Sequence, residues 1–351
     1  MRVGRVFAVR NPARAFAVVI AGVLALGMSA SASARGPKGA RDADMQLAVA
    51  QAHKRYVANR TGKLPADIPA LAAVSPDLYA VVVVRVDGQV FEAGDARKAF
   101  ALTGISAPFA AALVAEQRGP EALNSTLAAV AGIAPLPDAR GAGDWSGSPS
   151  TALAPEGALA TLGLVEPRGD TEGKWRAIQD NLTRFAGSPL SLDDAMYRSM
   201  QSEAPKVQST ARRLAAEGRL VDDATATADL FLRQGAATVN ARELAIMAAT
   251  LANDGVNPVA RHPAVKPAVA QSVQQLIQQS GARGGKSSAL NKSKLIATAG
   301  KSGAILVVVP GRLGIAVYAP PLDAAGVSVR GQLALRYLTQ ALLLDMDPGQ
   351  Q

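Results

Sequence analysis

The sequence predicts a mixed α/β (α+β) fold, with an antiparallel sheet formed from both chain ends, flanking helices, and a helical lobe. Two strand–turn–strand patterns carry this prediction, one near each end of the chain, at residues 80–93 and 305–318. Most of the sequence between them shows helical spacing of apolar residues. Strands at both ends and a block of helices between them indicate one sheet assembled from the termini and a separate lobe.

The first hairpin leads into a helix that we expect to be buried. Residues 80–84 are a β-branched run typical of a buried strand, and an Asp-Gly turn separates them from a partner strand at 89–93. Apolar spacing then predicts a helix that begins at Thr103 or Ser106 and ends at Gly119. This helix follows a loop beside the sheet and has apolar residues in its first turn, so we expect it to be buried in the middle of the protein.

The N-terminal segment has the pattern of a secretory signal. Residues 1–34 contain four arginines and no acidic residue, an apolar run at 15–28, and a small-x-small cleavage pattern at 32–34. The alternative is a membrane anchor, but the apolar run is shorter than the roughly 18–20 residues needed to span a bilayer. We therefore expect export to the periplasm, no stable membrane anchor after cleavage, and a disordered linker at 35–44.

The segment before the first strand holds one helix and one loop. Asp42 is expected to cap a helix that runs to about Asn59, and His53 is expected at the surface of this basic helix. Residues 62–71 form a loop interrupted by two prolines. Such a loop is a connector unless it borders a cleft.

The middle and the end of the chain are predicted mainly helical. Asn240 and Glu243 have capping-box spacing, and the apolar face that follows them ends at Gly255, so this is the clearest helix. Other helices are expected at 158–165, 175–185, 191–203, 206–217, 222–233 and 328–344. The folded domain is predicted to span residues 45–345, with the helical lobe at about 120–300, and to end in a tail at 346–351.

Composition excludes several classes of function. The formal charge is +9, and loss of the four leader arginines lowers it to +5, which is too small to indicate nucleic-acid binding without a recognition motif. The chain has no Cys and two His, so we expect no disulfide, no His/Cys metal site and no histidine-based catalytic triad.

Two short motifs suggest a serine-hydrolase layout without its chemistry. Hydrolases of the S-x-x-K type place a nucleophilic Ser and its Lys base at the entry of a buried helix, where this chain has residues 104–107, Gly-Ile-Ser-Ala. The second motif is Lys301-Ser302-Gly303, directly before a predicted strand. In penicillin-binding proteins and class A β-lactamases a Lys-Thr/Ser-Gly strand faces the S-x-x-K helix and supplies a backbone N–H to the oxyanion.

Longer runs resemble the bacterial serine-dependent glutaminases. The resemblance extends from about Met45 to Leu344. The segments that carry it are 62–71 with Pro76-Asp77, 86–88, 93–95, Arg233-Gln234, 244–253, 255–258, 309–311, 313–317, 320–323 and 328–331. It implies a β-lactamase/penicillin-binding-protein-like fold and an ancestral reaction that hydrolyses L-glutamine to L-glutamate and ammonia without a cofactor.

Carried over position by position, the resemblance implies that the reacting groups are missing. The nucleophile position falls on Gly104 and the base position on Ala107. Lys301, Ser302 and Gly303 are retained, but the Val-Gly-Gly-Gly that normally follows is shortened to Ala304, at the backbone expected to bind the oxyanion. The family's substrate-binding positions fall on Pro155, Glu203, Thr210, Phe231 and Arg283, of which Glu203 is retained.

No neighbouring residue is predicted to replace the nucleophile. Ser106 lies two residues from the nucleophile position and should point away from it on a helix, so we interpret it as an N-cap or a packing residue. On a strand, Ser302 would face away from Lys301.

The sequence thus favours a catalytically degenerate glutaminase homologue retained as a binding or scaffold protein, with a small amino acid or amide as a candidate ligand. The alternatives are an active amidohydrolase that uses Lys301 with Ser302 or Ser106, and a module that binds cell-wall peptide. Association into dimers or tetramers is expected by analogy with the family.

Overall fold

The structure is a computed structural model that describes residues 38–130, 153–281 and 295–344. The predicted signal segment, the tail and Arg283 lie outside these ranges. The described residues from Gly39 onward belong to one compact unit. Within the described ranges no helix combines the length and the hydrophobicity that a bilayer-spanning segment needs.

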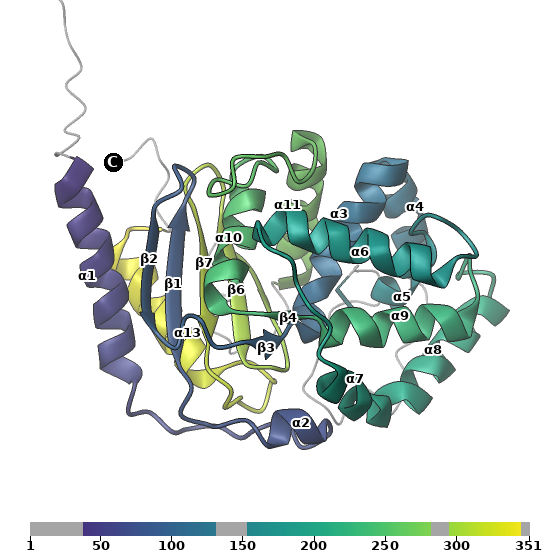
Figure 1. Ribbon diagram of the computed structural model, residues 1–351, viewed down its shortest axis with the longest axis horizontal. Coiled ribbons are helices and arrows are strands. Elements are labelled where there is room, and N and C mark those ends of the chain that lie inside the picture. Colours follow the sequence, from purple (N-terminus) through teal and green to yellow (C-terminus); the bar gives the residue numbers. More distant parts are fainter. Residues whose placement is uncertain (1–37, 131–152, 282–294, 345–351) are drawn as a thin grey trace, which may run out of the picture. The chain divides into compact units, whose positions relative to one another are not determined.

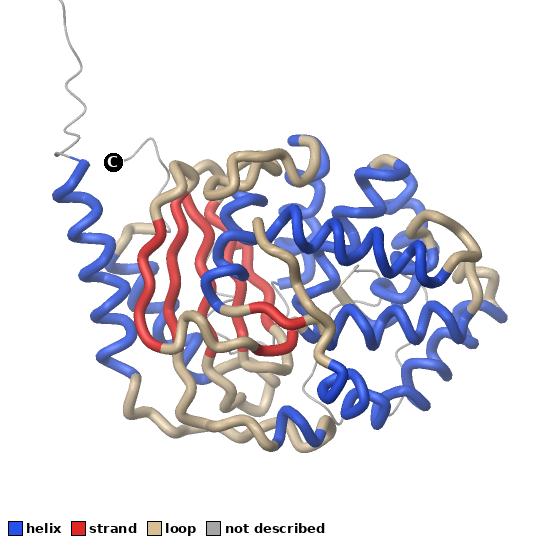
Figure 2. The backbone as a smooth tube through the Cα atoms, in the orientation of Figure 1, coloured by secondary structure: helices blue, strands red, loops and turns tan. Residues whose placement is uncertain are grey.

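A five-stranded antiparallel sheet joins the two ends of this unit (Figures 1 and 2). Its order is β2-β1-β7-β6-β5, so strands from the first and last thirds of the sequence are hydrogen-bonded at the β1–β7 pair. The bounds are β1 (Ala80–Arg85), β2 (Val90–Gly94), β5 (Ile296–Ala299), β6 (Ala304–Val309) and β7 (Leu313–Tyr318). Both predicted hairpins are confirmed, whereas β5 is a strand that the sequence analysis did not predict.

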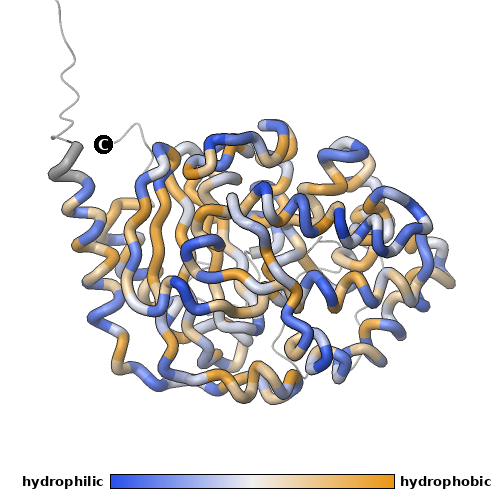
Figure 3. The backbone as a smooth tube through the Cα atoms, viewed as in Figure 1, coloured by the Kyte–Doolittle hydropathy of each residue, from blue (hydrophilic) through white to orange (hydrophobic). Residues whose placement is uncertain are grey.

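Helices cover both faces of the sheet, which explains why the central strands β1, β7 and β6 are almost continuously apolar (Figure 3). Alternate residues of β1 point to opposite faces: Val81 and Val83 pack with α1 (Lys38–Tyr56) and α13 (Val329–Ala341). Val82 and Val84 belong to the larger core on the other face, which includes α10 (Ala241–Ala252).

Two predictions about the N-terminal region are wrong in part. Helix α1 begins at Lys38 rather than at Asp42, so the predicted linker at 35–44 overlaps a helix. Proline is tolerated just before a helix, and Pro37 precedes this start in the sequence. His53 is half-buried rather than exposed, because its ring stacks on Tyr79 with ring centroids 4.7 Å apart.

The region between β3 (Phe100–Ala101) and β5 is mainly helical (Figure 1). Its remaining elements are η1 (Thr103–Ser106), α3 (Ala107–Arg118), α4 (Pro120–Val130), α5 (Pro155–Gly163), α6 (Thr171–Ala186), α7 (Asp194–Met200), η3 (Gln201–Glu203), α8 (Ala204–Ala216), α9 (Ala224–Ala236), β4 (Thr238–Val239), α10 and α11 (Pro267–Gly281). A short helix, α2 (Pro69–Ala72), precedes the sheet. Helix α10 lies within the range predicted for the lobe. It packs on β1, β6 and β7, so it is part of the helical layer that covers the sheet.

The capping box of α10 is confirmed and gives a test of local stability. The Asn240 side chain accepts a hydrogen bond from the Glu243 N–H at 3.0 Å, and the Glu243 side chain accepts one from the Asn240 N–H at 2.9 Å. We expect Asn240→Ala to lower the free energy of unfolding by about 1 kcal/mol, because the Glu243 N–H loses the side-chain oxygen that accepts its hydrogen bond. Urea denaturation measures the change, and Asn240→Gly should cost less than Asn240→Ala.

Candidate functional site

The entry of α3 contains the predicted nucleophile and base positions. The chain passes from β3 through the single 3-10 turn η1 into α3, which places Gly104 in η1 and Ala107 at the first residue of α3. Ala107 is buried, and it carries a methyl group where an amine would be required. Thr103 has a φ of 48°, in the left-handed region that β-branched residues rarely adopt.

Ser106 packs against the turn and does not cap the helix. Its Oγ donates a hydrogen bond to the Thr103 carbonyl oxygen at 2.7 Å, and the side chain is buried. The N-cap interpretation is wrong because Ser106 itself has helical angles, φ −66° and ψ −26°, whereas an N-cap residue needs an extended conformation. The packing interpretation is confirmed.

The Lys301-Ser302-Gly303 motif forms the hairpin turn between β5 and β6. The Gly300 N–H donates to the Ala304 carbonyl at 2.9 Å, and the Gly303 N–H donates to the Gly300 carbonyl at 2.9 Å. Gly303 has a φ of 90°, and a Cβ there would collide with the Ala319 carbonyl, so the turn requires glycine. The motif therefore lies directly before a strand, as the sequence predicts, and this strand, β6, begins at the buried Ala304.

The turn at 300–303 lies against the entry of α3. A Cβ added to Gly300 would lie 2.7 Å from Thr103 Oγ1 and 3.1 Å from the Ile105 side chain. Strands β5 and β6 both contact η1. The fold thus brings together the two motifs that the sequence separates by nearly 200 residues.

Lys301 is engaged by two carboxylates. Its Nζ donates to Asp67 Oδ2 and lies 3.5 Å from Glu203 Oε2. The side chains of Lys301, Asp67 and Glu203 are 18%, 27% and 21% exposed, so this ion cluster is partly shielded from solvent. Lys301 and Glu203 both occupy positions where the sequence matches the pattern described above, and the structure places them in contact.

Two buried hydroxyls lie at this junction: Ser302 follows Lys301 in the 300–303 turn, and Thr103 is the first residue of η1. Ser302 and Thr103 are 4% and 5% exposed, and neither side-chain oxygen has a hydrogen-bond partner among the described residues. A buried hydroxyl without a partner costs free energy, so such groups are concentrated at sites that bind ligand or water.

Asp67 is a functional candidate that the sequence analysis did not single out. It lies in the proline-interrupted loop at 62–71, which was interpreted as a connector. An acidic residue between two prolines was the available signal, but nothing local to the loop indicates that its partner is 234 residues away.

A second polar network lies beside η3. Arg233 contacts Glu172 at 2.6 Å and Asp229 at 2.7 Å, and the Tyr197 hydroxyl donates to Asp229. Burial and the Asp229 carboxylate raise the pKa of Tyr197. This network ties α6, α7 and α9 together. Among the described residues, no three metal-binding side chains cluster.

The sequence model of one family, described as glutaminase, matches residues 62–346. The chain belongs to the glutaminase family. It is 33% identical over 304 residues to Glutaminase 2 of Yersinia pestis, covering 85% of this chain and 87% of that protein. It is also 33% identical over 317 residues to a glutaminase of Mycobacterium ulcerans, covering 90% of this chain and 99% of that protein.

Solved structures of glutaminase-family proteins share the fold. A probable glutaminase, ybaS, superposes with a TM-score of 0.78 at 32% identity, covering 86% of this chain and 97% of that one. The protein named Mglu in its glutamate form gives a TM-score of 0.76 at 28% identity, covering 86% of this chain and 70% of that one. The predicted fold class is confirmed.

The remaining positions predicted from the family's substrate-binding residues differ in how exposed they are. Pro155 is exposed at the start of α5, and Phe231 is half-buried on α9. Thr210 is buried on α8, where its hydroxyl donates to the Lys206 carbonyl at 3.1 Å. Because its proton is used within its own helix, this hydroxyl can contact another group only as an acceptor.

Proposed function

We propose that this chain is an exported, non-catalytic member of the glutaminase family that acts as a binding or scaffold protein. The observation that carries the proposal is the side-chain chemistry at the entry of α3. Gly104 has no side chain and Ala107 has a methyl group, so neither a nucleophile nor a base is present at these positions. In other enzymes, loss of a serine nucleophile or its base lowers kcat by about 10⁶.

The alternative of an active enzyme with a rearranged Ser/Lys pair has less support. Lys301 uses its ammonium as a donor to Asp67, and an amine must have a free lone pair to take a proton from a serine. Ser106 is buried and bonded to a backbone carbonyl. Ser302 is adjacent to Lys301 in a tight turn, and no hydrogen bond joins the two side chains among the described contacts.

The retained architecture supports a binding role for the protein. The sheet, the covering helices and the junction between η1 and the 300–303 turn are all formed, and the junction presents charged and hydroxyl side chains. A small amino acid or amide is the candidate ligand, by family membership. Export rests on the sequence pattern of residues 1–34.

An ammonia-release assay with L-glutamine tests the proposal. We expect the mature chain to be slower than an active glutaminase assayed beside it by at least about 10⁴-fold, because both reacting side chains are absent. Gly104→Ser/Ala107→Lys is the matched variant, and turnover that appears only in this variant would attribute the loss to these two positions. Glutamine hydrolysis by the unmodified chain that disappears in Ser302→Ala or Ser106→Ala would refute the proposal.

Labelling with an electrophilic glutamine analogue gives a second test that does not depend on turnover. We expect mass spectrometry to find no covalent adduct on the mature chain. An adduct on Ser302 or Ser106 would favour the active alternative, since attack by either hydroxyl requires a nearby base.

A further inference from the structure

The segment from Thr61 to Ile68, here named the strap, crosses from the sheet to the helical lobe. Near its start, Lys63 pairs with Leu322: its N–H donates to the Leu322 carbonyl at 2.9 Å and its carbonyl accepts from the Leu322 N–H at 2.8 Å. Gly62 has a φ of 108°, and a Cβ there would lie 2.7 Å from the Leu322 carbonyl. The strap thus lies directly against the chain that follows β7.

The far end of the strap is bonded to the helical lobe. Ser202 Oγ donates to the Asp67 carbonyl at 3.0 Å. Just beyond the strap, in α2, the Ala70 N–H donates to Ser199 Oγ at 2.8 Å. Helix α2 also packs on α7 (Figure 1). Each of these contacts is a single hydrogen bond to a hydroxyl group that is at least partly open to solvent: Ser202 is the donor in one, and Ser199 is the acceptor in the other.

The charged contact of the strap lies between these two ends. Asp67 reaches Lys301 in the 300–303 turn, and Lys301 also lies 3.5 Å from Glu203 in η3. One ammonium therefore joins three segments that are distant in sequence: the strap, the helical lobe and the sheet. We call these three residues the latch.

Local structure gives the strap little stability of its own. It has no helix or strand, and Pro65 within it lacks the N–H that a backbone hydrogen bond requires. Segments with few backbone hydrogen bonds and exposed surroundings open at a low free-energy cost. Its two ends are held by the Lys63–Leu322 backbone pair and by the buried Ile68, so the closed position of the residues between them depends on the latch.

We propose that the strap is a closure over the junction of η1 and the 300–303 turn, and that the Asp67–Lys301–Glu203 latch holds it shut. Opening the latch frees the strap and exposes Lys301, and with it the turn that carries the unpartnered hydroxyl of Ser302. This inference is independent of whether the chain hydrolyses glutamine, because it concerns a conformational equilibrium rather than turnover.

Amide hydrogen exchange followed by mass spectrometry tests the proposal directly. Asp67→Asn keeps the shape of the side chain and removes its charge, and Lys301→Met removes the ammonium. For peptides covering residues 61–72 we expect either variant to exchange about tenfold faster than the unmodified protein, because a charge-assisted bond is lost. Peptides from α10 should exchange at the unmodified rate.

A matched control breaks an ion pair elsewhere in the protein. Lys266 and Glu116 lie 3.1 Å apart, away from the strap, and Glu116→Gln should leave exchange of residues 61–72 unchanged. If Asp67→Asn and Lys301→Met both leave strap exchange unchanged, the latch does not hold the strap. If they speed exchange equally in the strap and in α10, the effect is general destabilisation, and the proposal is likewise overturned.

Chemical modification of Lys301 gives a second readout. An amine-specific reagent should modify Lys301 several-fold faster in the Asp67→Asn variant than in the protein without the substitution. The exposed Lys266 is the internal reference for the reaction. Glu203→Gln should produce a smaller rise, because its oxygen is 3.5 Å from Nζ rather than in hydrogen-bond contact. Equal Lys301 modification in all three proteins would contradict a latch.

Discussion

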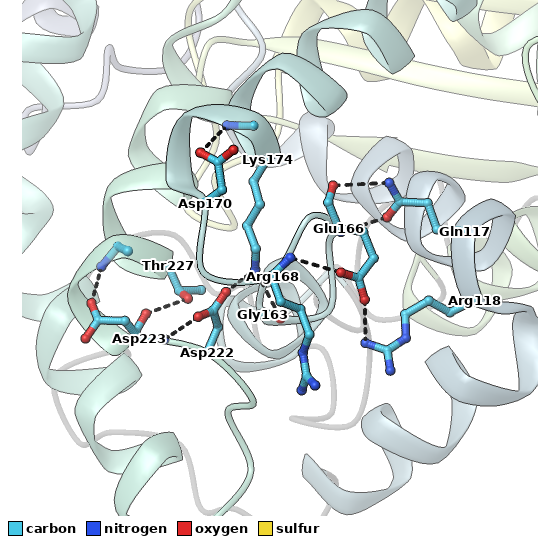
Figure 4. A network of polar contacts seen from close by, with 12 residues as sticks. Gln117, Arg118, Gly163, Glu166, Arg168, Asp170, Lys174, Asp222, Asp223 and Thr227 are labelled. Carbon is cyan, nitrogen blue, oxygen red and sulfur yellow. Dashed lines mark hydrogen bonds and ion pairs between the residues drawn. The ribbon is translucent and has the colours of Figure 1, made fainter.

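Asp222→Ala is expected to destabilise the protein by about 3–5 kcal/mol, because it leaves a buried ammonium without its counter-charge. Lys174 on α6 is 2% exposed, and its Nζ contacts the Asp222 carboxylate and donates to the Gly163 carbonyl at 3.3 Å (Figure 4). This group joins the end of α5, helix α6 and the loop before α9. Guanidinium or urea denaturation at neutral pH measures the loss.

Lys174→Met is the matched variant, since it removes the ammonium and fills a similar volume with apolar atoms. Replacing a buried charge by a well-packed apolar group is often far less costly than removing its partner alone. We therefore expect Lys174→Met to lose less stability than Asp222→Ala. Equal losses would mean that the Lys174 ammonium is not the source of the effect.

The same pair gives a pH dependence with a definite sign. Burial opposes ionisation of Asp222, but hydrogen bonds from Lys174 and from the Asp223 N–H outweigh it and lower the pKa of Asp222. Because the carboxyl is more acidic in the folded protein, its contribution to stability is complete above its unfolded-state pKa and is lost as the pH falls through the folded-state value. As the pH is lowered, the free energy of unfolding should therefore decrease less in the Asp222→Ala variant than in the protein without the substitution.

Much of the fold could be predicted because its signals are local. The strand at 80–84, the hairpin at 305–318 and the capping box of α10 each depend on residues within a few positions of one another. Helices α5 to α9 were predicted on the same basis, with errors at their ends, whereas α4 and α11 were not predicted. Local signals do not specify which strands become neighbours, so β5 and the β1–β7 pairing were open until the structure was known.

The candidate site could be predicted only where a motif marks it. The positions of Gly104 and Ala107 followed from their place at the entry of a buried helix, and Lys301 followed from its tripeptide. Asp67 did not, because its role depends on a contact across the fold that no spacing in the sequence encodes. The apolar run at 305–309 predicts the strand that follows Ser302, but the sequence analysis did not predict β5 on the other side of the turn.

Arg330→Met is expected to have the second-largest effect on stability, a loss of about 3 kcal/mol, because several backbone carbonyls lose a charged donor. Arg330 is 1% exposed near the start of α13 and donates to the carbonyls of Pro76, Asp77 and Leu78, at 3.3 Å for Asp77 and 2.9 Å for Leu78. Its guanidinium carbon also lies 5.1 Å from the centre of the Tyr79 ring. One side chain thus anchors the segment that connects α2 to β1.

Helix α13 supplies its own control, because Arg336 is exposed on the same helix. Arg336→Met should change the free energy of unfolding by less than about 0.5 kcal/mol, as surface substitutions usually do. Arg330→Lys separates charge from geometry: an ammonium keeps the charge but cannot reach three carbonyls with a planar fork, so it should recover only part of the loss. If Arg330→Lys is as stable as the unmodified chain, the charge alone is sufficient, and if Arg330→Met matches Arg336→Met, the carbonyl contacts contribute little to stability.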